Sequence, residues 1–221
     1  MKITILTLFP EVFESTFTKS IIKRALEKKL LSIEFINIRH FGLQKRKIVD
    51  DKPYGGGEGM VMMVEPIAKA LATIKPKPYT VLLSASGKKY SQKTARKLAK
   101  KKNLALICGH YEGIDARTEE LADMVISIGD FILTGGELPA MVIVDSVTRF
   151  IPGSINPKSP VDESFEKGLL EYPQYTRPEV FKNKKVPQVL LSGNHAKISA
   201  WRKEQSIKRT QRNRPDLLKT N

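Results

Sequence analysis

Residues 104–137 read LALICGHYEGIDARTEELADMVISIGDFILTGGE, and this stretch decides the fold class. Two short apolar runs, 104–108 and 125–128, have the length and composition of buried strands. Each is followed directly by a glycine-bearing loop, 109–115 in the first case and 129–137 in the second. Because ligands of open α/β sheets bind beyond the carboxyl ends of strands, we expect the two loops to converge on one pocket.

The flanking sequence alternates strand-like and helix-like stretches in the same way. Further strands are predicted at 3–8, 32–38 and 79–84, and helices at 10–26, from 66, at 91–102 and at 137–150. This alternation predicts an α/β fold in which helices cover both faces of a parallel sheet.

The texture of the sequence changes around Ile151, where prolines and serines replace the periodic pattern. Such composition is typical of a linker. We therefore predict an α/β domain over residues 1–153, a flexible linker over 154–168 and a basic, mainly helical domain over 169–221. The clearest helix of the last part begins after a cap at Asn194.

The chain is strongly basic, with 38 Lys and Arg against 23 Asp and Glu, which gives a net charge of +15. Residues 84–103 hold eight basic and no acidic side chains, and residues 181–221 hold eleven basic against two acidic ones. A nucleic acid is the favoured partner, because phosphate contacts supply most sequence-independent affinity. Solvated helix faces of a lysine-rich protein are the alternative.

The expected cellular compartment is inferred from membrane segments, signal peptides and cysteines. No apolar run approaches the ~18 residues that a membrane helix needs, and the apolar start at 3–8 is predicted to be a strand, not a signal peptide. The single cysteine, Cys108, excludes an internal disulfide and favours a reducing, cytoplasmic location. We expect Cys108 to be a buried, inert thiol, and no His or Cys spacing indicates zinc.

Three loops and one arginine are candidates for chemistry. Residues 50–60, DDKPYGGGEGM, hold four glycines that permit close approaches of the backbone, and a flexible surface loop is the alternative. They lack the signature of a phosphate-binding P-loop. The loops 109–115, with His110 as a candidate base, and 129–137 lack a dinucleotide-binding fingerprint, and tight turns without a ligand are their alternative. Arg149 ends an apolar helix, either as an ordinary C-terminal cation or as a group that stabilises negative charge.

Six segments, taken together, resemble one protein family. They are VDDKPYGGGEGMVMMVEP (49–66), CGHYEGID (108–115), SIGDFILTGGELPAM (127–141), DSVTRFIPG (145–153), YPQYTRPEV (172–180) and VPQVLLSGNHAKI (186–198). They are similar to the bacterial tRNA (guanine-N1)-methyltransferases of the TrmD type, in the same order and over nearly the whole chain. The resemblance implies a SPOUT fold, in which the C-terminal part of the sheet domain forms a deep trefoil knot.

The resemblance also implies an activity and its partners. The family transfers a methyl group from S-adenosylmethionine to N1 of the guanosine immediately 3′ of the tRNA anticodon, which supports reading-frame maintenance. It implies a homodimer with the active site at the subunit interface, and Mg²⁺, where it is used, without a dedicated protein site.

The residue roles expected from the resemblance fall into two groups. The S-adenosylmethionine pocket is expected to be lined by Leu83, Ser84, Gly109, Glu112, Ile128, Gly129, Asp130, Phe131, Ile132, Leu133, Gly135 and Gly136. Arg149 matches the family's catalytic arginine. The family's general base is an aspartate in Asp-Ser-Phe, where this chain has a glutamate, Glu163, with Asp162 one place earlier. Both carboxylates are therefore candidate bases.

Two other classes of function stay open at this point. An RNA-binding or ribosome-associated protein that kept the fold but lost activity would bind S-adenosylmethionine without turnover, and the glutamate at position 163 favours this alternative. An α/β enzyme for small anionic metabolites, with its positive charge used only for steering, would be insensitive to added tRNA.

Overall fold

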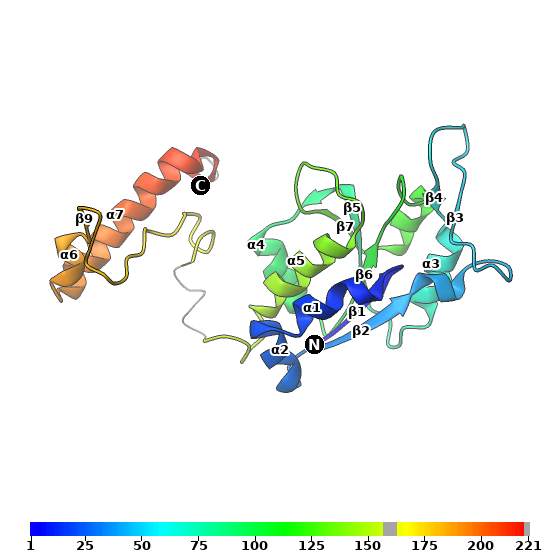
Figure 1. The fold of residues 1–221 in the computed structure, drawn as a ribbon, viewed down its shortest axis with the longest axis horizontal. Helices are drawn as coiled ribbons and strands as arrows, with labels where there is room; N and C mark the ends of the chain where they lie inside the picture. Colours follow the sequence, from blue (N-terminus) through cyan, green and yellow to red (C-terminus); the bar gives the residue numbers. More distant parts are fainter. Residues whose placement is uncertain (157–162, 219–221) are drawn as a thin grey trace. The chain divides into compact units, whose positions relative to one another are not determined.

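The computed structural model describes residues 1–156 and 163–218 (Figure 1). The chain divides into two compact units, Met1–Asn156 and Pro157–Asn221. Within the described residues, no helix combines the length and the apolar composition that crossing a membrane requires.

The first unit is built on a five-stranded parallel sheet with the strand order β2-β1-β6-β5-β7 (Figure 1). The strands are β1 (Lys2–Thr7), β2 (Ser32–Asn37), β5 (Tyr79–Lys89), β6 (Asn103–Cys108) and β7 (Met124–Ser127). β1 and β6 lie side by side near the centre and are almost entirely buried, as their continuous apolar sequences predict. The predicted α/β class and parallel sheet are confirmed, and β5 continues past its predicted end across a register shift between Leu83 and Lys88.

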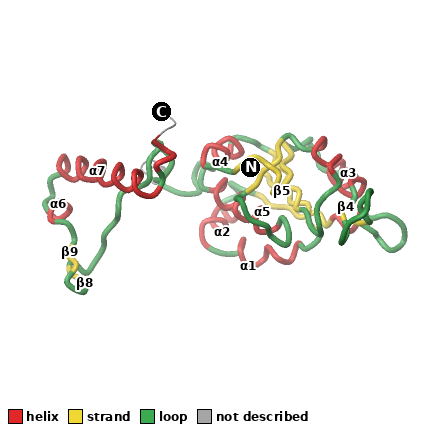
Figure 2. Tube along the Cα trace, turned by 90° about the horizontal axis from the view of Figure 1, so that it is seen from above, coloured by secondary structure: helices red, strands yellow, loops and turns green. Residues whose placement is uncertain are grey.

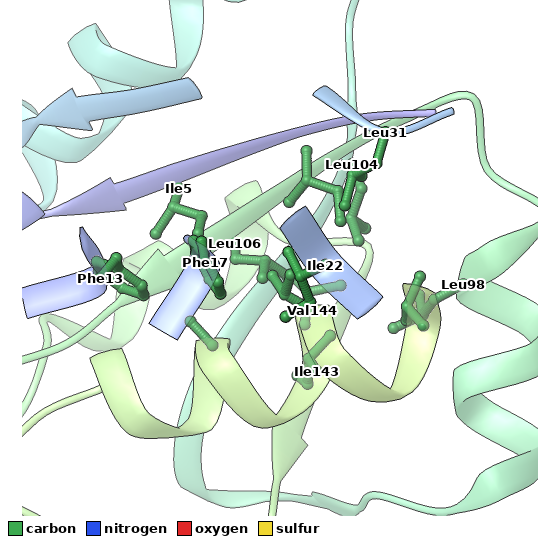
Figure 3. Close-up of a cluster of buried hydrophobic side chains, with 14 of the residues drawn as sticks. Ile5, Phe13, Phe17, Ile22, Leu31, Leu98, Leu104, Leu106, Ile143 and Val144 are labelled. Carbon is green, nitrogen blue, oxygen red and sulfur yellow. The ribbon is translucent and has the colours of Figure 1, made fainter. Parts of the chain in front are cut away.

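Helices cover both faces of this sheet (Figure 2). Against one face pack α1 (Glu14–Phe17), α2 (Ser20–Glu27), α4 (Gln92–Ala99) and α5 (Glu137–Thr148), and against the other α3 (Val64–Ala72). Successive strand residues point to opposite faces, so Leu104 and Leu106 join the first core and Ala105 joins the second. Figure 3 shows how Phe13, Phe17 and other large side chains fill the first core.

The predicted helix over residues 10–26 is not continuous. A 3₁₀ turn (Pro10–Phe13) and α1 come first. After a break at Thr18 and Lys19, α2 begins at Ser20, whose φ of 53° is left-handed. The Thr18 hydroxyl at this break donates to the Glu14 carbonyl, 2.9 Å away. Such side-chain bonds compete with helix continuation, which accounts for the interruption.

Shorter elements complete the first unit. β3 (Asp50–Asp51) and β4 (Val61–Met62) form an antiparallel pair, and two further 3₁₀ turns span Ile38–Phe41 and Ala116–Leu121. Ser91 caps α4 as predicted, its Oγ accepting from the Thr94 amide at 3.4 Å.

The second unit is organised around one long helix, α7 (His195–Asn213). The other elements are β8 (Val180–Phe181), β9 (Lys184–Lys185), α6 (Gln188–Leu191) and a 3₁₀ turn, Pro215–Leu218. Asn194 caps α7 as predicted, accepting from the Lys197 amide at 3.1 Å. An extended segment is bound to α7 by aromatic contacts, with Arg202 over the Tyr172 ring at 4.8 Å. Of this unit's described residues, only Thr210 is buried.

Candidate functional site

A cavity of about 240 Å³ lies beyond the carboxyl ends of β5, β6 and β7. Its walls come mainly from residues 82–85, 109–115, 126–129 and 131–136, each of which ends or follows one of these strands. The structure thus brings the two predicted glycine-bearing loops together at one edge of the sheet. Two other hollows, of about 430 and 340 Å³, contain neither of these loops. The position at the strand ends therefore selects the first cavity as the candidate site.

The residues expected to bind a cofactor gather at this cavity with one exception. Its lining includes Leu83, Ser84, Gly109, Glu112, Ile128, Gly129, Phe131, Ile132, Leu133, Gly135 and Gly136. Asp130 is not part of the lining, and its Oδ2 lies 3.1 Å from Nζ of Lys89 on an exposed surface. The lining also contains Ile114, Glu119 and Pro139, for which sequence reasoning proposed no role. Ile114 and Pro139 belong to the recognised loop motifs, and that position could have indicated them.

Two glycines allow the loop before α5 to pack tightly against the end of β6. A Cβ on Gly136 would lie 2.6 Å from the Cα of Cys108, and the Gly136 amide donates to the Gly109 carbonyl at 2.8 Å. A Cβ on Gly135 would lie 2.3 Å from Nε2 of His110. Any larger residue at these positions would force the two loops apart, so the glycines define the shape of the cavity.

A buried carboxylate holds His110 at the cavity wall. Glu137, the first residue of α5, is only 5% exposed, and its Oε1 accepts from the Thr7 hydroxyl at 2.6 Å. Its Oε2 lies 2.8 Å from Nε2 of His110, and the Phe9 ring meets the imidazole edge-on at 4.8 Å. The amino end of α5 favours this negative charge. The three hydrogen-bonded residues come from β1, the β6 loop and α5, and so join three elements at the cavity.

The glycine-rich segment 50–60 supports the cavity from outside. Together β3 and β4 form a hairpin whose Met60 carbonyl accepts from the Glu112 amide at 3.0 Å. The Met62 amide in turn donates to the Gly113 carbonyl at 2.9 Å, and Gly59 lies directly against the Glu112 side chain. Of the two alternatives for this segment, the close backbone approach therefore holds at its C-terminal end, which is bonded to the loop that lines the cavity.

Two ionisable side chains of the 109–115 loop have shifted pKa values. Burial raises the pKa of Tyr111, and the charge of Asp50 acts in the same direction. Hydrogen bonds from Arg117 lower the pKa of Asp115, with 2.6 Å between Nη2 and Oδ2. Asp115 therefore stays ionised well into the acidic range.

Cys108 ends β6 directly behind the cavity. Its side chain is fully buried, and burial raises the pKa of the thiol, with a further increase from the negative charge of Glu137. The thiolate is the reactive form of cysteine, so this group is protonated and inert at neutral pH. The prediction that this thiol is buried is confirmed.

Of the three predicted catalytic residues, the two that the structure describes do not line the cavity. Arg149 directly follows the twelve residues of α5 and does not line the cavity. At about 1.5 Å per residue, it lies about 20 Å along the helix from Gly136. Glu163 is half-buried and belongs to the second unit. Asp162 lies outside the described residues. Over 1–156 and 163–218, no group of three or more His, Cys, Asp or Glu side chains could hold a metal ion.

Comparison with known proteins gives a consistent result. The chain matches the family model described as tRNA (Guanine-1)-methyltransferase TrmD over residues 1–220. It is 56% identical over 218 residues to the tRNA (guanine-N(1)-)-methyltransferase of Caldanaerobacter subterraneus subsp. tengcongensis, covering 97% of this chain and 90% of that protein. The protein of the same name from Carboxydothermus hydrogenoformans is 55% identical, with 99% and 88% covered. That from Geobacillus kaustophilus is 54% identical, with 99% and 91% covered.

Proposed function

The chain belongs to the tRNA (guanine-1)-methyltransferase TrmD family, and from this we infer that it transfers a methyl group from S-adenosylmethionine to N1 of a tRNA guanosine. It is an S-adenosylmethionine-dependent methyltransferase. We propose that the target is the guanosine immediately 3′ of the anticodon and that the modification supports reading-frame maintenance in the cytoplasm. The observation that carries the proposal is the cavity at the strand ends, where the family's pocket residues gather.

The cavity residues fit S-adenosylmethionine. Apolar side chains such as Leu83 and Leu133 suit the faces of an adenine ring, and residues 128–136 form no helix or strand. The backbone of 128–133 can therefore hydrogen-bond the edge of the ring, while Gly135 and Gly136 admit the methionine part. When bound, this molecule supplies a methyl group that is already activated on a sulfonium. Mg²⁺, where the reaction uses it, is proposed without a dedicated protein site.

The chain's own residues prepare the guanine for attack. N1 carries a proton at neutral pH, so its lone pair becomes available only when a base accepts that proton. We propose Glu163 or Asp162 as this base, a role that typically contributes ~10²–10⁴-fold. Negative charge then grows on O6, where the guanidinium of Arg149 stabilises it. The target base must be unstacked from the anticodon loop to reach these groups.

The exposed side of α5 supports a homodimer with the active site at the subunit interface. α5 is apolar around most of its circumference, yet its Leu138 and Val142 side chains are 53% and 44% exposed. Helices of this composition are normally buried on all sides. A second copy packed about a two-fold axis would cover this face. If the two α5 helices are antiparallel, the partner's Arg149 lies near the cavity that a single chain's Arg149 does not line.

The remaining parts of the proposal concern the chain path and the tRNA. We propose that the C-terminal part of the sheet domain threads as the SPOUT trefoil knot. Support comes from the tight approach of β5 to β7 at their register shift, where a Cβ on Gly87 would lie 2.5 Å from the Ile126 amide nitrogen. We propose residues 1–153 as the methyltransferase domain, 154–168 as the linker and 169–221 as a tRNA-binding domain. The basic residues of α4 and of 181–214 would hold phosphates.

The test is single-turnover methyl transfer from labelled S-adenosylmethionine to an unmodified tRNA with guanosine 3′ of the anticodon. The same tRNA with adenosine at that position is the substrate control. Loss of transfer only in Glu163→Gln identifies Glu163 as the base, and loss only in Asp162→Asn identifies Asp162. A wild-type protein that binds S-adenosylmethionine but transfers nothing would overturn the enzymatic function and favour an RNA-binding relic.

A further inference from the structure

The segment that follows Glu163 closes on itself. The Glu166 amide donates to the Glu163 carbonyl at 3.3 Å, and the Phe165 amide donates to the Leu169 carbonyl at 2.8 Å. The Ser164 hydroxyl accepts from the Glu171 amide at 3.0 Å. Residues 163–171 therefore form a compact turn, the base-bearing turn, whose backbone fixes the start of the Glu163 side chain.

This turn is bonded to the C-terminal part of α7. The Leu170 amide donates to Oγ1 of Thr210 at 2.8 Å, and the Ser206 hydroxyl donates to the Leu170 carbonyl. A third bond runs from Nη1 of Arg209 to the Glu171 carbonyl at 3.3 Å. Both backbone groups of one residue are thus held by hydroxyls one helical turn apart, which fixes the position of the turn along α7.

Thr210 stands apart from the rest of its helix. It is 0% exposed and the only buried residue among those described in the second unit. Its hydroxyl, which also donates to the Ser206 carbonyl at 2.7 Å, has both its donor and acceptor roles satisfied. Because this unit is sparsely packed, burial of the Thr210 side chain gains little apolar contact. We therefore attribute its contribution to the hydrogen bond that its hydroxyl accepts from the Leu170 amide.

The exposed surface of α7 is rich in cations around this point. Lys203, Lys208, Arg209 and Arg212 are all exposed, and Arg209 also bonds to the base-bearing turn. Phosphates bound by this helix would therefore be held by the same element that fixes the turn. A rigid connection then links the tRNA backbone to the carboxylate.

We propose that Thr210 is a positioning residue for methyl transfer, whose hydroxyl fixes the base-bearing turn on α7 so that tRNA bound there places Glu163 against guanine N1. The inference rests on the proposed function, with Glu163 as the base. A displacement of about 1 Å at a reacting group lowers rates roughly a hundredfold. Loss of the hydrogen bond between Thr210 and the Leu170 amide therefore lowers the rate of methyl transfer and leaves the affinity for tRNA unchanged.

The experiment compares full-length Thr210→Val, Thr210→Ser and, as a matched control on the same helix, Ser199→Ala at an exposed hydroxyl. Thr210→Val is expected to lower the single-turnover rate at saturating tRNA at least about tenfold. Dissociation constants for tRNA and S-adenosylmethionine stay within about twofold, and Thr210→Ser restores the rate. A purely structural Thr210 would instead weaken tRNA binding at an unchanged saturated rate, and that result overturns the proposal.

A double-mutant cycle asks whether Thr210 acts through Glu163. Adding Thr210→Val to Glu163→Gln is expected to cause no further loss, because the group being positioned has already been removed. Multiplicative losses overturn the proposal. A Glu163→Gln enzyme with the wild-type rate overturns the base assignment itself, whatever Thr210→Val does. If Thr210→Val shows no cooperative thermal unfolding transition, and so is not folded, Ser206→Ala takes its place in the same comparison. That variant removes the hydrogen bond to the Leu170 carbonyl.

Discussion

Replacing Gly136 with alanine tests the packing that shapes the cavity. The new Cβ would lie 2.6 Å from the Cα of Cys108 and 2.8 Å from the Gly109 amide nitrogen. Ordinary carbon contacts are 3.5–4.0 Å, so the amino end of α5 and the end of β6 must separate by about 1 Å. Both are backbone, and neither can rotate away. The Gly136–Gly109 hydrogen bond, 2.8 Å long, is then lost.

The expected destabilisation follows from these terms. Overpacking typically costs about 1–3 kcal/mol, and the lost hydrogen bond adds about 1 kcal/mol. The stiffer unfolded chain of alanine offsets about 0.4–1 kcal/mol. We therefore expect the free energy of unfolding to fall by about 1–3 kcal/mol. Because the cavity wall moves, S-adenosylmethionine should also bind at least about tenfold more weakly, which corresponds to 1.4 kcal/mol.

Urea unfolding and calorimetric titration with S-adenosylmethionine measure the two quantities. Gly109→Ala is the matched control for stability, because its Cβ would crowd only the Ile114 side chain, with Cδ1 2.7 Å and Cγ1 2.9 Å away, and no backbone atom closer than 3.9 Å. Rotation of Ile114 relieves that contact, so we expect a loss below about 1.5 kcal/mol. If Gly136→Ala unfolds and binds like the wild type, the close approach of α5 to β6 is not what shapes the site.

Three further predictions concern other parts of the molecule. Thr7→Val leaves a buried oxygen of Glu137 without its donor, and should lower the free energy of urea unfolding by about 1.5–3 kcal/mol. Val142→Lys places charge on the exposed face of α5 and should weaken the proposed dimer at least about 100-fold in analytical ultracentrifugation, whereas a monomeric wild type would contradict the dimer. Because Arg117 lowers the pKa of Asp115 in the folded state, the pair stabilises the protein above the ordinary aspartate pKa of about 3.9 and loses that effect as the pH falls through the lower folded-state value. Asp115→Asn should therefore reduce the free energy of unfolding at pH 7 by roughly 0.2–1 kcal/mol, and the difference should shrink in urea titrations below pH 4.

Local signals in the sequence were sufficient for the strands, most helices and the position of the pocket. A short, continuous apolar run such as 104–108 predicts a strand buried on both faces of a parallel sheet. A glycine loop directly after it must then lie at the carboxyl edge of that sheet. Helix caps were equally local, because Ser91 and Asn194 need only reach an amide three residues ahead.

Features that depend on contacts distant in sequence could not be predicted. Thr7 and Glu137 are 130 positions apart, and no periodicity relates them. The bonding of the 50–62 hairpin to the 109–115 loop is backbone pairing, which leaves no pattern in the side chains. The resemblance to the methyltransferase family supplied the expected role of Arg149, but only the length of α5 showed how far Arg149 lies from the cavity.

The strand order has a consequence for synthesis of the protein. β1, Lys2–Thr7, is synthesised well before its partner β6, which ends at Cys108. At about 5–20 residues per second, β1 waits on the order of 5–20 s for that neighbour. Until then its apolar side chains, Ile3, Ile5 and Leu6, have only the edge strand β2 to pair with. The nascent chain therefore exposes the apolar side chains of β1 for seconds, which makes it a candidate substrate for ribosome-bound chaperones. It also places the slow step of folding at the closure of the central β1–β6 pair.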